Sequence, residues 1–106
     1  TQGVSSAASD VYKRQIGTSV TAVFRGQVVF SDWLRGFGLI TIVDHGGGYM
    51  TLYGHADTLF KNAGDWVEGG ETLARAGNSG GGYEPGIYFE VRHEGTVKNP
   101  TTWLAK

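Results

Sequence analysis

The sequence predicts an all-β fold built as an antiparallel sheet of short strands. Glycine supplies 18 of the 106 residues, against a usual share of about 7%, and it separates runs rich in β-branched and aromatic residues. Residues 86–93 (GIYFEVRH) alternate between apolar and polar side chains, which is the period of a strand with one buried face. No stretch has the period of a helix longer than about two turns.

Composition limits the chain to one modest domain with a single core, because it has 106 residues and 40% hydrophobic content. A net charge of −1 and a pI near 6.2 give no electrostatic case for a nucleic-acid partner. No run of 18 apolar residues is present, so we expect no direct membrane insertion. The absence of cysteine excludes disulfides and thiolate metal sites.

Residues 1–15 (TQGVSSAASDVYKRQ) are expected to be a non-native or disordered leader. They are small and polar, show no sustained period, and resemble a translated sequencing adapter over VSSAASDVYKRQ. They also lack the apolar centre of a signal peptide. We therefore place the folded domain at residues 16–106.

The first half of the domain predicts three strands, at residues 20–30 (VTAVFRGQVVF), 39–44 (LITIVD) and 49–53 (YMTLY). Gly26 interrupts the first strand as a bulge or a hairpin turn. Residues 31–38 (SDWLRGFG) predict a loop with Phe37 at its tip. A turn of one histidine and three glycines joins the second and third strands.

In the second half, residues 54–59 predict a helical turn and residues 64–74 two short extended pieces. Residues 77–82 predict a flexible loop, and residues 99–100 begin a final helical turn. The loop leads into the strand at residues 86–93. Its two faces are expected to differ: Ile87, Phe89 and Val91 face the core, whereas Gly86, Tyr88, Glu90 and Arg92 share the open face. Trp103 and Leu104 are expected to close the core.

The three histidines do not form a metal-binding motif. A hydrolytic zinc site needs about three protein ligands and an open water position, and the chain has neither a His-x-His nor an H-E-x-x-H motif. His45 and His93 are expected to be turn residues. His55 follows a glycine that ends a strand and is the one histidine expected to reach the open face. One imidazole cannot hold a catalytic zinc, so we expect no metal and no cofactor.

Nucleophilic catalysis and phosphate binding also lack their motifs. The chain has no G-x-S-x-G sequence, and Ser79 lies among glycines without a neighbouring base. The glycine-rich loop lacks the lysine and the following helix of a P-loop. Most aromatic side chains are therefore expected in the core, with Tyr88 and Phe37 as exceptions. Beside Arg92 and Arg35, these two rings have the composition of a protein-binding hot spot; packing against a neighbouring loop is the equal alternative.

The order of four motifs resembles that of LytM (lysostaphin-type) zinc endopeptidases. Residues 44–55 (DHGGGYMTLYGH) resemble their hairpin, and residues 64–71 (GDWVEGGE) their G-x-x-V-x-x-G-x repeat. Residues 77–80 (GNSG) and 88–92 (YFEVR) resemble their glycine-rich loop and final site strand. The match covers residues 16–104 and implies the barrel-sandwich hybrid of the LytM type, truncated at its N-terminus.

The departures from this family concern its catalytic residues. In active members the final strand carries His-x-His, one histidine ligating zinc and the other catalytic, and these positions hold Gly86 and Tyr88 here. The other two ligands come from an earlier H-x-x-x-D motif, whose place is taken by residues 1–15. His55, which matches the catalytic histidine of the hairpin, is a surviving remnant. The resemblance therefore implies a degenerate domain with no catalytic residue and no bound metal.

Among degenerate LytM domains, the motifs WLRGFG, LYGH, GNSGG and YFEVRH resemble EnvC-type murein hydrolase activators most closely. This resemblance implies a periplasmic domain that binds and activates N-acetylmuramoyl-L-alanine amidases in cell separation. We expect the amidase to contact Tyr88, Arg92 and Phe37, with Arg35 in support.

Three alternatives stay open. The first is an active zinc endopeptidase of peptidoglycan, and the second is a plain peptidoglycan-binding module. The third is a biotinyl or lipoyl carrier domain, because GDWVEGGETL also resembles its pattern. A carrier presents its modifiable lysine at a hairpin tip with methionine beside it, a setting that none of the lysines has: Lys13, Lys61, Lys98 and Lys106.

Overall fold

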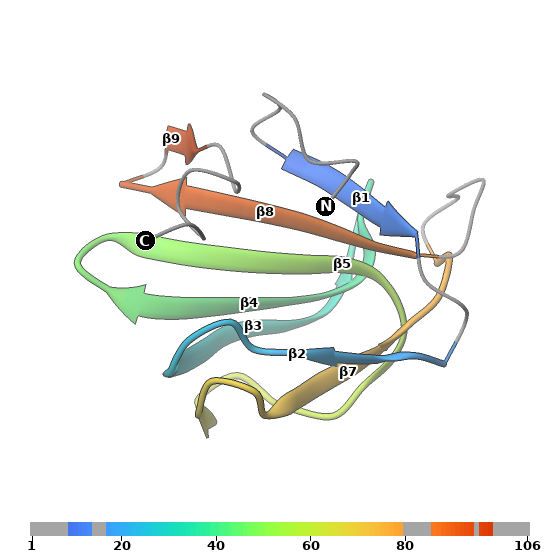
Figure 1. Ribbon diagram of the computed structural model, residues 1–106, viewed down its shortest axis with the longest axis horizontal. Helices are drawn as coiled ribbons and strands as arrows, with labels where there is room; N and C mark the ends of the chain where they lie inside the picture. The colour runs from blue at the N-terminus through green and yellow to red at the C-terminus, as the bar shows by residue number, and fades with distance from the viewer. Residues whose placement is uncertain (1–8, 14–16, 80–85, 95, 99–106) are drawn as a thin grey trace.

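The computed structural model describes residues 9–13, 17–79, 86–94 and 96–98, and within them the secondary structure is entirely β, as predicted. The described residues form nine strands that curl into a half-barrel, in which β8, β5, β4 and β3 lie side by side (Figure 1). Their bounds are β1 (Ser9–Lys13), β2 (Ser19–Thr21), β3 (Gly26–Leu34), β4 (Gly38–Gly46), β5 (Tyr49–Leu59), β6 (Trp66–Val67), β7 (Thr72–Ala76), β8 (Gly86–His93) and β9 (Thr96–Lys98).

Every strand pairing in the described part of the chain is antiparallel, which confirms the predicted sheet type. The main order is β1-β8-β5-β4-β3-β6. Strand β7 pairs with both β5 and β2, and β9 pairs with β8. This connectivity curls the end of β5 away from the main sheet, so that the sheet folds over its own core.

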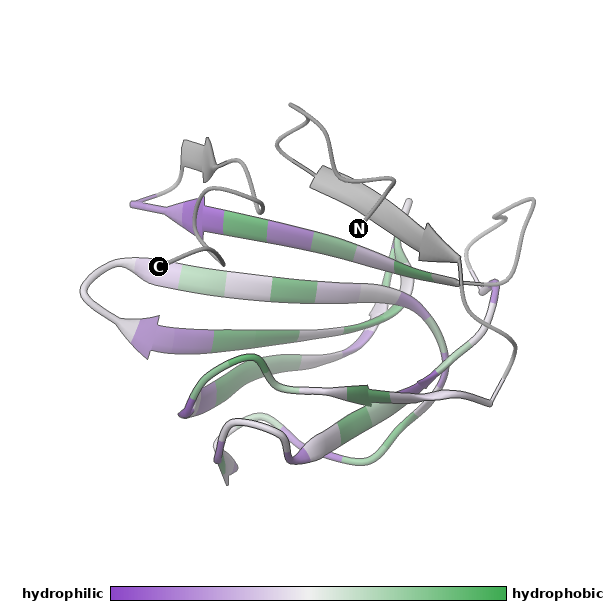
Figure 2. Cartoon of the chain, viewed as in Figure 1, coloured by the Kyte–Doolittle hydropathy of each residue, from purple (hydrophilic) through white to green (hydrophobic). Residues whose placement is uncertain are grey.

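The core lies on one face of β8, as the alternation in its sequence predicts. Ile87, Phe89 and Val91 are all buried, and Figure 2 shows the alternation of hydrophobic and hydrophilic residues along this strand. They pack in one cluster with Tyr53 and Leu73, among others. Burying each such side chain contributes about 1.5–3 kcal/mol, so this face of the sheet supplies much of the stability.

Two segments differ from the prediction. Residues 31–38 form no long loop, because β3 continues to Leu34 and β4 begins at Gly38. A tight turn joins them, in which Phe37 N–H donates to Leu34 O at 2.9 Å and Gly36 has φ 91°. Residues 54–59 form no helical turn but continue β5. His55 has a positive φ of 60°, and the next residue, Ala56, pairs with both β4 and β7. Beyond Ala56 the strand pairs with β7.

The strand β1 falls within the range expected to be a leader. It pairs with β8 from Ser9 opposite Glu90 to Lys13 opposite Gly86. Five residues of that range are therefore part of the sheet, while the origin of residues 1–8 and the boundary at residue 16 stay predictions. The turn at residues 99–100 and the closing role of Trp103 and Leu104 lie outside the described residues.

Two tryptophans expected in the core are instead exposed: Trp33 is 56% and Trp66 58% accessible. Trp33 lies near the end of β3, and Trp66 belongs to the two-residue strand β6. None of the described residues belongs to a helix that could span a membrane.

Candidate functional site

The candidate site lies where the turn before β4 meets β5 and β8. Gly54 of β5 is opposite Tyr88 of β8. A Cβ at Gly54 would lie 3.4 Å from Phe37 O and 3.5 Å from Tyr88 Cβ, so glycine lets the turn close over β5. The rings of Phe37 and Tyr88 then pack with centroids 5.1 Å apart, and both side chains are partly buried. The structure thus brings these two predicted residues together, with each ring covering part of the other.

His55 lies beside this aromatic pair. Its backbone N–H donates to Phe37 O at 2.7 Å, and its ring stands edge-on to Tyr88 at 5.9 Å. Nδ1 is 2.7 Å from Ser79 O; because a carbonyl only accepts, Nδ1 carries the proton. Ser79 Oγ accepts from Leu39 N–H at 3.1 Å and donates to Ala56 O. Ser79 therefore holds the backbone around His55, and its hydroxyl proton is engaged by the Ala56 carbonyl.

The residue that sequence reasoning missed is Glu90. Its side chain was expected on the open face, yet it is only 2% exposed. Its carboxylate accepts a hydrogen bond of 2.6 Å from Tyr88 Oη and another from Arg92 Nε, with which it forms an ion pair. The sequence did hold a signal for these two contacts, though not for the burial, because Tyr88, Glu90 and Arg92 alternate along one face of the strand.

Arginine side chains complete the site. The Arg92 side chain stays 41% exposed although its Nε contacts Glu90. Arg35 is exposed in the same turn as Phe37. Among the described residues it makes no hydrogen bond or ion pair with Tyr88, Phe37 or Arg92. The structure therefore brings three of the four predicted contact residues together and leaves Arg35 exposed in the turn that carries Phe37.

The other two histidines have structural roles. His45 lies in β4, where Nδ1 is 2.9 Å from Arg25 O and Nε2 is 2.7 Å from Thr51 Oγ1. Thr51 Oγ1 is in turn 2.8 Å from the hydroxyl of Tyr53. Burial raises the pKa of Tyr53 to about 12. His93 ends β8 and stacks on Tyr49 with centroids 4.1 Å apart.

The donor atoms at the site do not fit a catalytic zinc. Gly86 offers no side-chain donor, the Tyr88 hydroxyl is engaged with Glu90, and His55 supplies a single imidazole. In the part of the chain that the structure describes, no group of three or more histidine, aspartate or glutamate side chains is placed to hold a metal ion. About three such ligands are needed.

An antiparallel half-barrel with this hairpin and site strand defines a LytM-type domain. Residues 6–100 match peptidase family M23, and the chain belongs to this family. In solved structures, the catalytic domain of lysostaphin from Staphylococcus simulans superposes with a TM-score of 0.86 at 23% identity, over 94% of this chain and 80% of that domain. The family and the fold inferred from the sequence motifs are thereby confirmed.

Two curated relatives are named as activators. The chain is 42% identical over 90 residues to the murein hydrolase activator EnvC of Escherichia coli, covering 85% of this chain and 22% of EnvC. It is 32% identical over 89 residues to the murein hydrolase activator NlpD of the same organism, covering 83% of this chain and 23% of NlpD. The chain thus spans about a fifth of the length of these relatives.

Proposed function

We propose that this chain is a non-catalytic LytM-like domain of a periplasmic murein hydrolase activator. In this role it binds and activates an N-acetylmuramoyl-L-alanine amidase during cell-wall splitting at division. The observation that carries the proposal is the hydrogen-bonded row Tyr88–Glu90–Arg92, which occupies the strand face where active members carry His-x-His. Similarity to EnvC and NlpD supports the same role.

The geometry suits protein binding because its contact groups are already ordered. The Tyr88 ring packs against Phe37 and the edge of His55, while its hydroxyl donates to Glu90. An aromatic held in this way loses little side-chain entropy when a partner covers it. Tyrosine and arginine are also the residue types enriched in hot spots.

The two arginines contribute differently. The Nε of Arg92 is engaged by Glu90, so its terminal N–H groups remain for a carboxylate or backbone carbonyl of the amidase. Arg35 is exposed in the turn that carries Phe37. A charge in that position affects the association rate more than the affinity.

The test is amidase stimulation by the double variant Tyr88→Ala/Arg92→Ala. Purified amidase digests dye-labelled sacculi with and without the domain, and we expect the double variant to lose most of the stimulation. Arg75→Ala is the matched control, because Arg75 is an exposed arginine on β7 whose guanidinium lies over Phe60. Stimulation equal to that of the wild type by a folded double variant would show that the proposed surface is wrong.

The same sample tests the endopeptidase alternative. Elemental analysis measures the zinc content, and chelator is added to a cleavage assay on cross-linked muropeptides without amidase. Substoichiometric zinc and no cleavage are expected from the donor set at the site. Stoichiometric zinc together with chelator-sensitive cleavage would overturn the non-catalytic assignment.

A further inference from the structure

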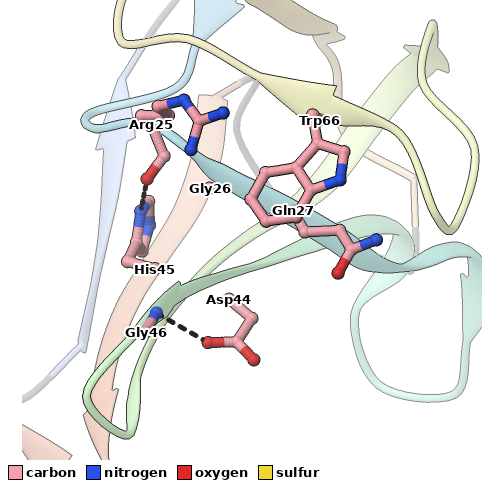
Figure 3. A pocket seen from close by; sticks show the side chains of 7 residues that line it. All are labelled: Arg25, Gly26, Gln27, Asp44, His45, Gly46 and Trp66. Carbon is pink, nitrogen blue, oxygen red and sulfur yellow. Dashed lines mark hydrogen bonds between the residues drawn. The ribbon is translucent and has the colours of Figure 1, made fainter.

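A second candidate site lies at the opposite end of β4 from Tyr88 and Phe37. It is an open pocket of about 460 Å³ (Figure 3), lined by Arg25, Gly26, Gln27, Asp44, His45, Gly46 and Trp66. Phe37 precedes the first residue of β4, whereas Asp44 to Gly46 are its last. The nine residues of that strand separate the two sites by roughly 25 Å, so one ligand of ordinary size cannot occupy both.

The aromatic wall of the pocket is Trp66, whose side chain is 58% exposed. The guanidinium carbon of Arg25 lies 4.9 Å from the centroid of the indole. Arg25 also pairs with Glu68, with its Nε donating to Glu68 Oε2 at 3.0 Å. The arginine lies over one face of the ring, and Trp66 stays more than half exposed. A rigid indole of this kind offers a flat apolar surface beside a hydrogen-bond donor.

The polar wall is also ordered. Asp44 Oδ1 accepts from Gly46 N–H at 2.9 Å, and Gln27 Nε2 donates to Gly64 O at 3.2 Å. Each residue keeps one acceptor oxygen, Asp44 Oδ2 and Gln27 Oε1, that has no hydrogen-bond partner in the described part of the chain. These acceptors are therefore oriented before any ligand arrives.

Glycine at position 26 allows this wall to form. A Cβ there would lie 2.6 Å from Asp44 O and from Val43 Cγ1, and 3.0 Å from His45 Nδ1. Its absence lets β3 approach the end of β4. His45 is held in place through both ring nitrogens.

The charges around the pocket decide between ligand classes. Arg25 is paired with Glu68, and Asp44 adds a further negative charge. No excess positive charge remains to attract a phosphate or another anion. A sugar ring, in contrast, has an apolar C–H face that packs on an indole, and hydroxyl groups that donate to carboxylate and amide oxygens.

We propose that this pocket binds a saccharide, the glycan strand of murein, at a site separate from the amidase-binding face. The identity of the glycan rests on the proposed function, which places the domain at murein. Binding here holds the domain on the glycan while Tyr88 and Arg92 face the amidase.

The test is an NMR titration of the ¹⁵N-labelled domain with the peptide-free disaccharide of N-acetylglucosamine and N-acetylmuramic acid. Saturable shifts are expected at the Trp66 indole N–H and the Gln27 side-chain amide, with none at the Tyr88 and Arg92 backbone. Trp66→Ala is expected to weaken binding about tenfold. Trp33→Ala is the matched control, because Trp33 is similarly exposed, at 56%, and lies outside the pocket.

The inference is overturned if neither Trp66 nor Gln27 shifts at millimolar disaccharide, or if Trp33→Ala weakens binding as much as Trp66→Ala. Preferential binding of a free stem peptide would also overturn it. Parallel amidase assays separate this result from the proposed function. No saccharide binding with normal stimulation removes only the saccharide site, whereas saccharide binding without stimulation removes only the amidase-activating role.

Discussion

Tyr88 donates a hydrogen bond of 2.6 Å to the carboxylate of Glu90, two residues further along the same face of β8. Arg92 reaches the other oxygen of that carboxylate from the opposite side. A glutamate that is 2% exposed thus joins the two side chains proposed to contact an amidase. Their orientation depends on a residue that a partner hardly touches.

Replacing Glu90 by alanine should therefore reduce both stability and amidase binding. The change leaves the Tyr88 hydroxyl and Arg92 Nε without their acceptor, and we expect a loss of roughly 2–3 kcal/mol in the free energy of unfolding. Glu90→Gln keeps an acceptor oxygen and should lose about 1 kcal/mol. Urea denaturation measures the free energy of unfolding of both variants. Glu68→Ala, which breaks the exposed pair with Arg25, should lose less than about 1 kcal/mol; equal losses for Glu68→Ala and Glu90→Ala would contradict this account.

Tyr53 makes the domain sensitive to alkaline pH. Burial raises its pKa from 10.0 to about 12, so the folded state retains the phenolic proton after the unfolded state has lost it. The contribution of protonated Tyr53 to the free energy of unfolding is fully present below pH 10. It is lost as the pH rises toward 12, by roughly 2–3 kcal/mol in total. Urea denaturation at several alkaline pH values should show this loss, and Tyr53→Phe should remove that part of the slope. Tyr49→Phe is the control, and an unchanged slope in Tyr53→Phe would assign the loss to other groups.

Two fully buried threonines on adjacent strands should respond in opposite ways to valine. Thr41 and Thr51 are both 0% exposed. Thr51 Oγ1 bonds to His45 and Tyr53, whereas Thr41 Oγ1 has no partner within the described residues. Thr41→Val removes a buried, unsatisfied hydroxyl and should raise the free energy of unfolding by about 1 kcal/mol, while Thr51→Val should lower it by roughly 1–3 kcal/mol. Thermal and urea denaturation show whether each variant gains or loses free energy of unfolding. A destabilised Thr41→Val would contradict this prediction, because it would mean that the Thr41 hydroxyl has a hydrogen-bond partner.

The sequence predicted the sheet because its strongest signals are local. The alternation of Ile87, Phe89 and Val91 with polar residues fixes which face of β8 is buried. The glycine-rich turn then indicates the hairpin, and the order of the motifs indicates the family. The continuation of β5 past residue 54 was not predictable in this way, because it depends on a positive φ at His55 and on pairing with the distant β7.

The sequence predicted that Tyr88, Arg92 and Phe37 lie on one surface, and the structure brings these three together, but neither the geometry of the candidate site nor the place of Glu90 was predicted. Tyr88 and Arg92 follow from strand period, and Phe37 from its position in a glycine-flanked turn. The burial of Glu90 depends on how β8 packs against its neighbours, which no local pattern encodes. The pocket beside Trp66 was missed for a similar reason, because it requires the close approach of β3 and β4 at Gly26.

Phe37 tests whether the aromatic pair is part of the amidase-binding surface. Its ring packs against Tyr88 at 5.1 Å, so Phe37→Ala removes both a contact surface and the support that orders Tyr88. We expect amidase affinity, measured by calorimetric titration, to fall about tenfold. Phe24→Ala is the matched control, because Phe24 is 48% exposed and lies against His45 at the other end of β4. If both variants bind equally well, the aromatic pair only packs the turn onto β5, and the amidase contacts must be sought elsewhere on the domain.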